Sequence, residues 1–264
     1  MLNVPDASAR LPGRHYYQWE YENLVLRSPL EMESNLGVAH AAMAYVYGAR
    51  HDWAAADREC QQALGLDSKD ASIYYFYAYN VLIPQVRYDE AVREMRRALE
   101  LGPASLAING NYGGTLMFAR RYPEAKAQLD TALAMEPNFF LTHARMREWF
   151  EIRGRFEEAR QAAIINRPEF SKMKVQPNKN EYWHGALEIE QQRMETLGET
   201  LTERIFSAIA YAQLGDHENA MKWLQKCDAN EDDLLPNYMR SPLLDPLHGD
   251  PHYDALLRKL NLVP

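Results

Sequence analysis

The chain has 264 residues, with 29 basic and 37 acidic side chains and a formal net charge of −8. Hydrophobic residues make up 47% and charged residues 25%, a globular composition with enough chain to bury a core without cross-links. A negative charge of this size repels nucleic acid and anionic membrane surfaces, so we expect neither as a partner.

The N-terminal region carries no targeting signal that we can identify. Residues 1–14 are rich in Pro, Gly and polar side chains and are expected to be loose. The sequence shows neither the apolar segment of a signal peptide nor a run of about 20 apolar residues that could span a bilayer. Two cysteines far apart in sequence, Cys60 and Cys227, do not form a disulfide framework. We therefore expect a cytoplasmic location.

The first predicted helix lies within residues 15–36, where the run HYYQWEYENLVLRS precedes Pro29. A repeated pattern then fills residues 37–172. An aromatic residue followed three positions later by alanine begins the second helix of each repeat. The separation between successive repeats is 35 residues once and 34 residues twice. These pairs are Trp53 and Ala56, Tyr88 and Ala91, Tyr122 and Ala125, and Phe156 and Ala159.

The spacing has a physical cause. Ala91, Met95 and Ala98 occupy one stripe of a helix, and the small residues allow two helices to approach closely. Pro103 and Pro137 end two of these helices because proline cannot continue the backbone hydrogen bonds. The period and its residues resemble the tetratricopeptide repeat, a family of helical hairpins. The resemblance implies an all-α, right-handed solenoid of antiparallel helical hairpins, with four repeats in residues 37–172.

The pattern weakens after the fourth repeat. Residues 173–181 are predicted to be a loop, followed by a helix from about Tyr182 to Leu197. Residues 182–264 are expected to form a degenerate C-terminal repeat region that ends in a capping helix. Asp250 is the expected N-cap of that last helix and Pro251 its first residue.

The C-terminal segment, residues 243–262, resembles the end of the tetratricopeptide regions found at the C-terminus of bacterial multidomain regulators. Those proteins carry a kinase, cyclase or DNA-binding module before the repeats. This sequence has no Gly-rich phosphate loop, kinase catalytic loop or basic recognition helix. The resemblance implies an interaction module that stands alone or comes from a longer chain.

The sequence offers weak candidates for chemistry. His248 and His252 are four residues apart, but Gly249 and Pro251 make a turn and helix cap the better interpretation. Cys60 occupies a buried stripe position, which favours a small hydrophobic role over a nucleophile. We therefore predict no catalytic residue, no metal site and no cofactor, and a protein that is not an enzyme.

The resemblance to tetratricopeptide repeats implies that the first helix of each repeat lines a concave groove. Transferring the family's groove positions residue by residue gives ten candidate partner-binding residues. They are Tyr45, Phe76, Tyr77, Asn80, Gly110, Asn111, Gly114, Met117, Arg145 and Glu148.

Two features of this set suggest a ligand. Asn80, Asn111 and Arg145 match three of the five positions of the carboxylate clamp in co-chaperone repeats, although the two clamp lysines would fall at Phe76 and Leu141. The asparagines are also common in the repeat for structural reasons.

Gly110 and Gly114 remove two side chains opposite the aromatic residues 73–79. They therefore predict a cleft that takes an apolar side chain, bordered by Phe76, Tyr77 and Met117. Close helix packing, which also suits Gly113, is the alternative explanation for these glycines.

The predicted function is non-catalytic binding of a protein or peptide in the concave groove. A basic patch at Arg145, Arg147, Arg153 and Arg155 would steer an acidic peptide, or would simply be a solvated helix face. Arg147 also replaces a small residue of the repeat pattern, which brings the packing of the fourth repeat into question. Two other functions remain open: a small-molecule-sensing regulatory module, and a scaffold that forms a homo-oligomer or docks an enzyme.

Overall fold

The computed structural model describes residues 36–67, 69–229 and 235–263. The expectations for residues 1–14 and for the helix within 15–36 lie outside this range, apart from Leu36 itself. The described part begins with helical hairpins. They are α3 (Leu36–Ala49) with α4 (Trp53–Leu66), α5 (Ala71–Phe76) and the π-helix η1 (Tyr77–Leu82) with α6 (Tyr88–Leu101), α7 (Leu106–Phe118) with α8 (Tyr122–Met135), and α9 (Phe140–Ile152) with α10 (Phe156–Ile164).

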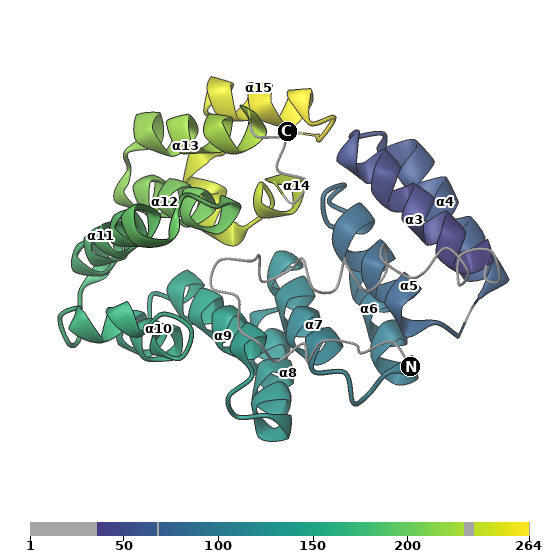
Figure 1. The fold of residues 1–264 in the computed structure, drawn as a ribbon, viewed down its shortest axis with the longest axis horizontal. Coiled ribbons are helices and arrows are strands. Elements are labelled where there is room, and N and C mark those ends of the chain that lie inside the picture. The colour runs from purple at the N-terminus through teal and green to yellow at the C-terminus, as the bar shows by residue number, and fades with distance from the viewer. Residues whose placement is uncertain (1–35, 68, 230–234, 264) are drawn as a thin grey trace, which may run out of the picture.

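Further helices follow the fourth hairpin in the described part of the chain. They are η2 (Pro168–Lys172), α11 (Lys179–Leu197), α12 (Leu201–Leu214), α13 (His217–Ala229), α14 (Leu235–Tyr238), η3 (Pro242–Leu247) and α15 (Pro251–Lys259). The described residues contain no strand, and Figure 1 shows the hairpins following one another along a curved row. The predicted all-α solenoid is confirmed.

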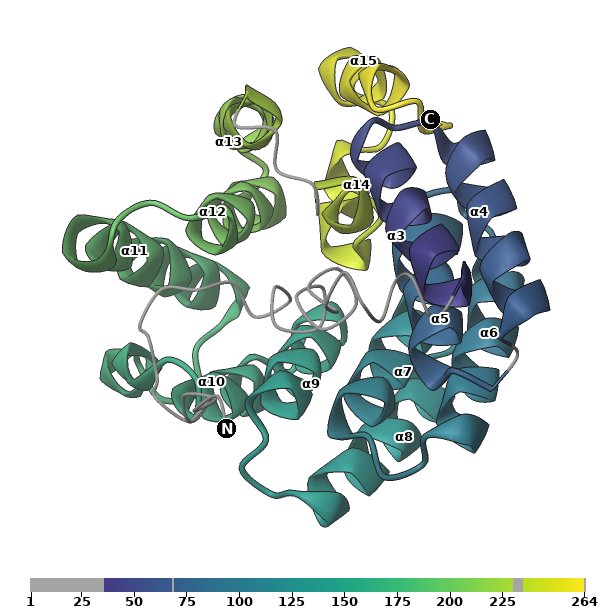
Figure 2. The same cartoon turned by 45° about the vertical axis from the view of Figure 1, so that its right-hand side comes forward.

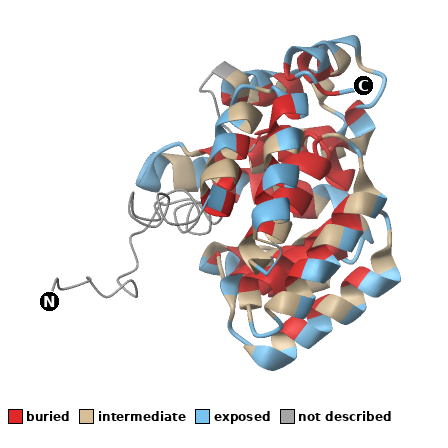
Figure 3. Cartoon of the chain, turned by 90° about the vertical axis from the view of Figure 1, so that its right-hand side faces the viewer, coloured by how far each residue is buried: buried red, intermediate tan, exposed pale blue. Residues whose placement is uncertain are grey.

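The repeated small residues lie where helices cross. Ala91, Met95 and Ala98 on α6 are fully buried, as the stripe predicted, and so are Ala56 and Ala125 on neighbouring hairpins. Figure 3 shows buried residues concentrated where the hairpins stack. Within the described residues, each helix is too short or too polar to cross a membrane.

The turns inside the hairpins share a backbone conformation. Two residues before the second helix, the chain adopts a positive φ, at His51 (57°), Val86 (62°), Arg120 (60°) and Gly154 (68°). Glycine takes this conformation freely, whereas a β-branched residue is strained in it. Val86 is therefore the least suited residue among the four.

Replacing Val86 with asparagine is expected to raise the free energy of unfolding by about 1 kcal/mol, because asparagine tolerates the left-handed region. Val86 is 44% exposed, so little packing is lost. Urea denaturation followed by circular dichroism measures the change. Val46→Asn on α3, also exposed, is the control and should not stabilise the protein. Equal or lower stability of Val86→Asn would contradict the strain argument.

The second hairpin contains one extra residue. Its first helix changes from α-helix to π-helix at Tyr77, and the backbone N–H of Ile83 donates to the carbonyl of Ala78. A π-turn accommodates an inserted residue inside a helix. This insertion explains why the first repeat spacing is 35 residues and the next two are 34.

The C-terminal elements make hydrogen bonds with the first two hairpins. Trp53 donates from Nε1 to the carbonyl of Leu260 at 2.9 Å, and Asn237 donates to the carbonyl of Tyr79 at 2.6 Å. Arg240 donates to the carbonyl of Pro84 at 2.9 Å. In Figures 1 and 2, α14 and α15 accordingly lie beside α3 and α4. The row of hairpins therefore bends far enough for its last helices to contact its first.

Two predicted helix starts in the C-terminal part can be compared with the structure. Asp250 caps α15 and Pro251 is its first residue, as predicted. By contrast, α11 begins at Lys179, inside the predicted loop 173–181 and before the expected Tyr182. The cause is a capping box, in which Asn178 and Glu181 satisfy each other's backbone N–H groups.

Candidate functional site

The ten predicted groove residues are more buried than a binding surface requires. Tyr45, Asn80 and Glu148 are partly exposed. The others are buried: Phe76, Tyr77, Gly110, Asn111, Gly114, Met117 and Arg145. Met117, for example, is 1% exposed and belongs to the hydrophobic core. The structure thus gives most of this set an internal position.

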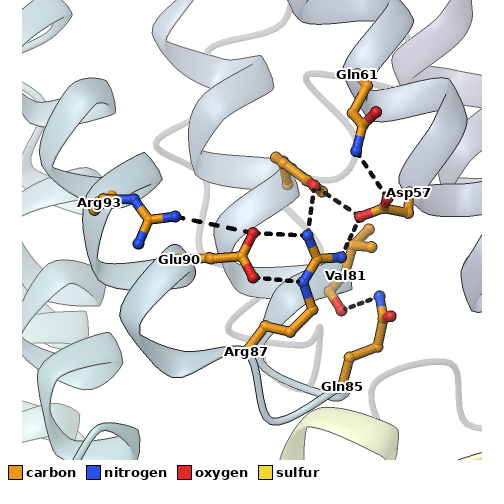
Figure 4. A network of polar contacts seen from close by, with 8 residues as sticks. Asp57, Gln61, Val81, Gln85, Arg87, Glu90 and Arg93 are labelled. Carbon is orange, nitrogen blue, oxygen red and sulfur yellow. Dashed lines mark hydrogen bonds and ion pairs between the residues drawn. The ribbon is translucent and has the colours of Figure 1, made fainter.

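Tyr77 faces the neighbouring helices instead of joining the predicted cleft. Its hydroxyl donates to Asp57 on α4 at 2.7 Å, and Arg87, at the N-cap of α6, contacts the same carboxylate. Burial and the Asp57 carboxylate raise the pKa of Tyr77 to about 12. Figure 4 shows this network, in which Arg87 also pairs with Glu90. Tyr77 therefore links the first two hairpins. Tyr77 is the first residue of the π-helix η1.

Three predicted residues do meet around a small cavity. The rings of Tyr45 and Phe76 are 6.5 Å apart, and both line a cavity of about 20 Å³ with Asn80. Asn237 from α14 lines the same cavity. The partly exposed Tyr45 and Asn80 are thus the predicted residues best placed to meet a partner near the first two hairpins.

Asn111 and Arg145 bind each other. Arg145 donates from Nη2 to Asn111 Oδ1 at 2.9 Å and to the hydroxyl of Tyr79 at 2.5 Å. It also pairs with Glu148 at 2.9 Å, and Asn111 donates to the hydroxyl of Tyr75 at 2.9 Å. These contacts join the second, third and fourth hairpins. They give two of the three matching clamp residues, Asn111 and Arg145, a structural role in this chain.

The predicted glycine cleft is filled by neighbouring side chains. A Cβ at Gly110 would lie 3.5 Å from Leu141 Cγ and Thr142 Oγ1, and one at Gly114 would lie 2.9 Å from Arg145 Nε. The space beside both glycines is therefore occupied by the first helix of the next hairpin. This geometry favours close packing as the explanation for Gly114, whereas a Cβ at Gly110 would make ordinary van der Waals contacts.

The sequence did not reveal a buried ionic cluster between the fourth hairpin and the helices that follow it. Arg147 donates from Nε to Glu151 at 2.7 Å, and Tyr182 donates to the same carboxylate at 2.5 Å. The Arg147 guanidinium lies 4.6 Å from the ring centres of both Phe170 and Phe206. The signal in the sequence was the arginine that replaces a small residue at position 147.

Nearby carboxylates keep the buried Arg147 ionised. Burial disfavours the charged form of Arg147, but the carboxylates of Glu151 and Glu190 outweigh it and hold its pKa above the ordinary arginine value. Burial, with Glu151 nearby, raises the pKa of Tyr182 well above the usual tyrosine value, so its hydroxyl remains a donor. Arg147 is accordingly a fixed positive charge inside the protein.

A second cavity lies beside this cluster. Its volume is about 40 Å³, and its walls come from the fourth hairpin, the segment after it, α12 and α14. The residues that line it are Ala144, Arg147, Ala163, Asn166, Arg167, Thr202, Phe206 and Tyr238. It is a separate hollow from the one at Tyr45 and Asn80, and none of the ten predicted residues lines it.

The other residues that the sequence offered as candidates for chemistry, His252 and Cys60 among them, have structural roles. In the described part of the chain, no group of three or more His, Cys, Asp or Glu residues could hold a metal ion. His252 follows the N-cap Asp250, whose carboxylate accepts its backbone N–H. Burial raises the pKa of the Cys60 thiol well above its usual value, which suits a core residue.

Comparison with known sequences now identifies the class of protein. Residues 85–145 and residues 206–230 each match a model of the tetratricopeptide repeat. Together with the stacked hairpins, these matches show that the chain contains tetratricopeptide repeats.

A curated relative and two solved structures are similar to this chain. The type IV pilus assembly protein PilF of Pseudomonas aeruginosa is 29% identical over 121 residues, which are 45% of this chain and 48% of PilF. The match thus spans about half the length of this relative.

The crystal structure of PilW, a type IV pilus biogenesis factor, aligns with a TM-score of 0.50 and 19% identity, over 76% of this chain and 97% of PilW. A structure of Pseudomonas aeruginosa PilF aligns with a TM-score of 0.45 and 19% identity, over 92% of each chain.

Proposed function

We propose that this protein is a non-catalytic scaffold that binds a protein or peptide on the inner surface of its solenoid. The observation that carries the proposal is the hollow at Tyr45 and Asn80, where partly exposed aromatic and amide groups from two hairpins meet. Aromatic side chains supply contact area and an amide supplies hydrogen bonds in both directions, which suits a peptide backbone. Stacked helical repeats commonly use such extended inner surfaces for binding.

The partner we propose is a component of a type IV pilus assembly system. The support is the relative PilF, a type IV pilus assembly protein that matches nearly half of this chain. Because the match covers only 48% of PilF, the assembly role is a proposal for this chain and depends on the experiment below. The cytoplasmic location also stays a prediction.

Affinity capture from lysate of the source organism tests the proposal. Wild type is compared with Tyr45→Ala/Asn80→Ala, which removes the two partly exposed groups of the hollow. Arg97→Ala/Glu100→Ala, an exposed ion pair on α6, is the matched control. Circular dichroism confirms that all three proteins remain helical.

We expect wild type and the control to capture the same amount of a pilus assembly component. Tyr45→Ala/Asn80→Ala should capture at least tenfold less of it. If Tyr45→Ala/Asn80→Ala captures the partner as well as wild type does, the interface does not include Tyr45 and Asn80. Capture of no specific partner by wild type would contradict the scaffold function itself.

A further inference from the structure

The cavity between the fourth hairpin, α12 and α14 has the size of a small polar group. Its volume is about 40 Å³, and a water molecule needs at least about 10–15 Å³ on this measure. The space therefore holds roughly three waters, or one carboxylate group. Its borders come from residues between 144 and 167, from Thr202 and Phe206 on α12, and from Tyr238 on α14. The fold itself therefore builds the hollow from distant parts of the sequence.

Two buried arginines flank the same aromatic ring in this cavity. Arg147 and Arg167 are 4% and 3% exposed, and their guanidinium carbons lie 4.6 and 4.8 Å from the ring centre of Phe206. Arginine offers hydrogen-bond donors and no acceptor. A ligand that enters here must therefore present acceptors, and an anion suits two adjacent guanidinium groups.

The arginines are held in place before any ligand arrives. Arg147 donates from Nε to Glu151, and Arg167 donates from Nη1 to Glu190. Both carboxylates are almost fully buried, and neither lines the cavity. These ion pairs fix the two guanidinium planes, so a ligand would meet donors that need little rearrangement.

One donor of the pair has no hydrogen-bond partner. Nη2 of Arg167 is buried and makes no hydrogen bond, and its nearest ionic contact is Glu203 Oε1 at 3.9 Å. A buried donor without a partner is unfavourable by about 1–3 kcal/mol. Arg167, the residue that carries this donor, lines the hollow together with a second arginine, Arg147.

We propose that the hollow bordered by Arg147, Arg167 and Phe206, here called the double-arginine pocket, binds a carboxylate group. A planar carboxylate matches the fork of a guanidinium, and Thr202 and Asn166 line the same cavity with further polar groups. Ala144 and Ala163 line it with methyl groups, which suit the carbon chain that bears the carboxylate. If the carboxylate belongs to a macromolecular partner, this inference rests on the proposed binding function and adds the chemistry that the partner presents.

Nuclear magnetic resonance titrations test the pocket, with the Nε–Hε signals of Arg147 and Arg167 as the readout. Three kinds of probe separate the sources of a carboxylate. Sodium acetate stands for a small molecule, against sodium chloride at equal ionic strength. Acetyl-tetra-alanine with a free C-terminus stands for a peptide end, against its C-terminal amide. The peptide Ac-AAEAA-NH₂ stands for an acidic side chain, against Ac-AAQAA-NH₂.

A variant that fills the pocket without breaking an ion pair completes the test. Ala144→Leu places a larger side chain in the cavity and leaves both arginines with their partners. Ala127→Leu makes the same change at an exposed position of α8 and is the matched control. Thermal unfolding monitored by circular dichroism checks that both variants are folded.

We expect at least one carboxylate probe to shift both arginine signals with a Kd at least tenfold lower than its uncharged or chloride control. Ala144→Leu should raise that Kd at least tenfold, while Ala127→Leu changes it less than twofold. The probe that binds most tightly identifies the source of the carboxylate.

Equal binding within all three probe pairs would overturn the inference, and so would an unchanged Kd in Ala144→Leu. The outcome is separable from that of the capture experiment. Partner loss in Tyr45→Ala/Asn80→Ala with no preference for carboxylate probes keeps the scaffold function and rejects the pocket. A carboxylate preference with no captured partner supports the pocket and rejects the scaffold function.

Discussion

Replacing Arg147 with methionine is expected to lower the free energy of unfolding by about 3–5 kcal/mol. The Glu151 side chain is 1% exposed, and its carboxylate accepts hydrogen bonds from Arg147 and Tyr182. Without the arginine, the Glu151 carboxylate remains in the interior with the neutral Tyr182 hydroxyl as a hydrogen-bond donor. Methionine fills a similar volume between Phe170 and Phe206, so the loss comes mainly from the unpaired charge. Urea denaturation followed by circular dichroism measures it.

A double variant separates the charge from the packing. Arg147→Met/Glu151→Gln removes both charges and keeps an acceptor for the Tyr182 hydroxyl, so most of the lost stability should return. Arg97→Met, at an exposed position of α6, is expected to change stability by less than about 0.5 kcal/mol. If the double variant is as unstable as Arg147→Met, the ion pair is not the cause.

Much of the fold was predictable because it repeats. An aromatic residue, an alanine three positions later and a period near 34 residues specify a helical hairpin, and stacking such hairpins buries one continuous core. Each repeat thus carries independent information about the same structure. The alanines at positions 56, 91 and 125 are fully buried, as that pattern requires.

The binding surface was harder to predict because family positions assume a regular helix. The π-helix that begins at Tyr77 ends that regularity, and Tyr77 contacts Asp57 on α4. The single spacing of 35 residues was the visible sign of the insertion. The spacing alone does not say whether the extra residue lies in a turn or inside the helix.

The double-arginine pocket depends on contacts between distant parts of the chain. Arg147 meets Phe206, and Tyr238 lines the same cavity from α14. Nothing in the local pattern around position 147 specifies these neighbours, because the C-terminal region departs from the repeat. An arginine in place of a small residue shows that the packing changes there, without showing which residues accommodate it.

Two glycines on α7 differ in how closely the neighbouring helix packs against them. A Cβ at Gly113 would lie 2.5 Å from Leu129 Cδ2 and 2.6 Å from Leu129 Cγ, whereas one at Gly110 would meet only contacts of 3.5 Å or more. Both residues are buried on the same helix. The two positions therefore form a matched pair in which the same substitution meets different surroundings.

Gly113→Ala is expected to lower the free energy of unfolding by about 1–3 kcal/mol, because the overpacking against Leu129 exceeds the gain in helix propensity. Gly110→Ala should instead raise it by up to about 1 kcal/mol, the gain in helix propensity without a clash. Urea denaturation of both variants measures the contrast.

The background of Leu129→Ala tests the cause directly. That substitution alone should destabilise the protein by about 2–5 kcal/mol, because it leaves a cavity beside α7. In this background the methyl group of Gly113→Ala enters the cavity, so the same change should become stabilising. A change of sign assigns Gly113 to the approach of α7 and α8. A Gly113→Ala effect that is the same in both backgrounds would show that Leu129 is not the residue that requires glycine at this position.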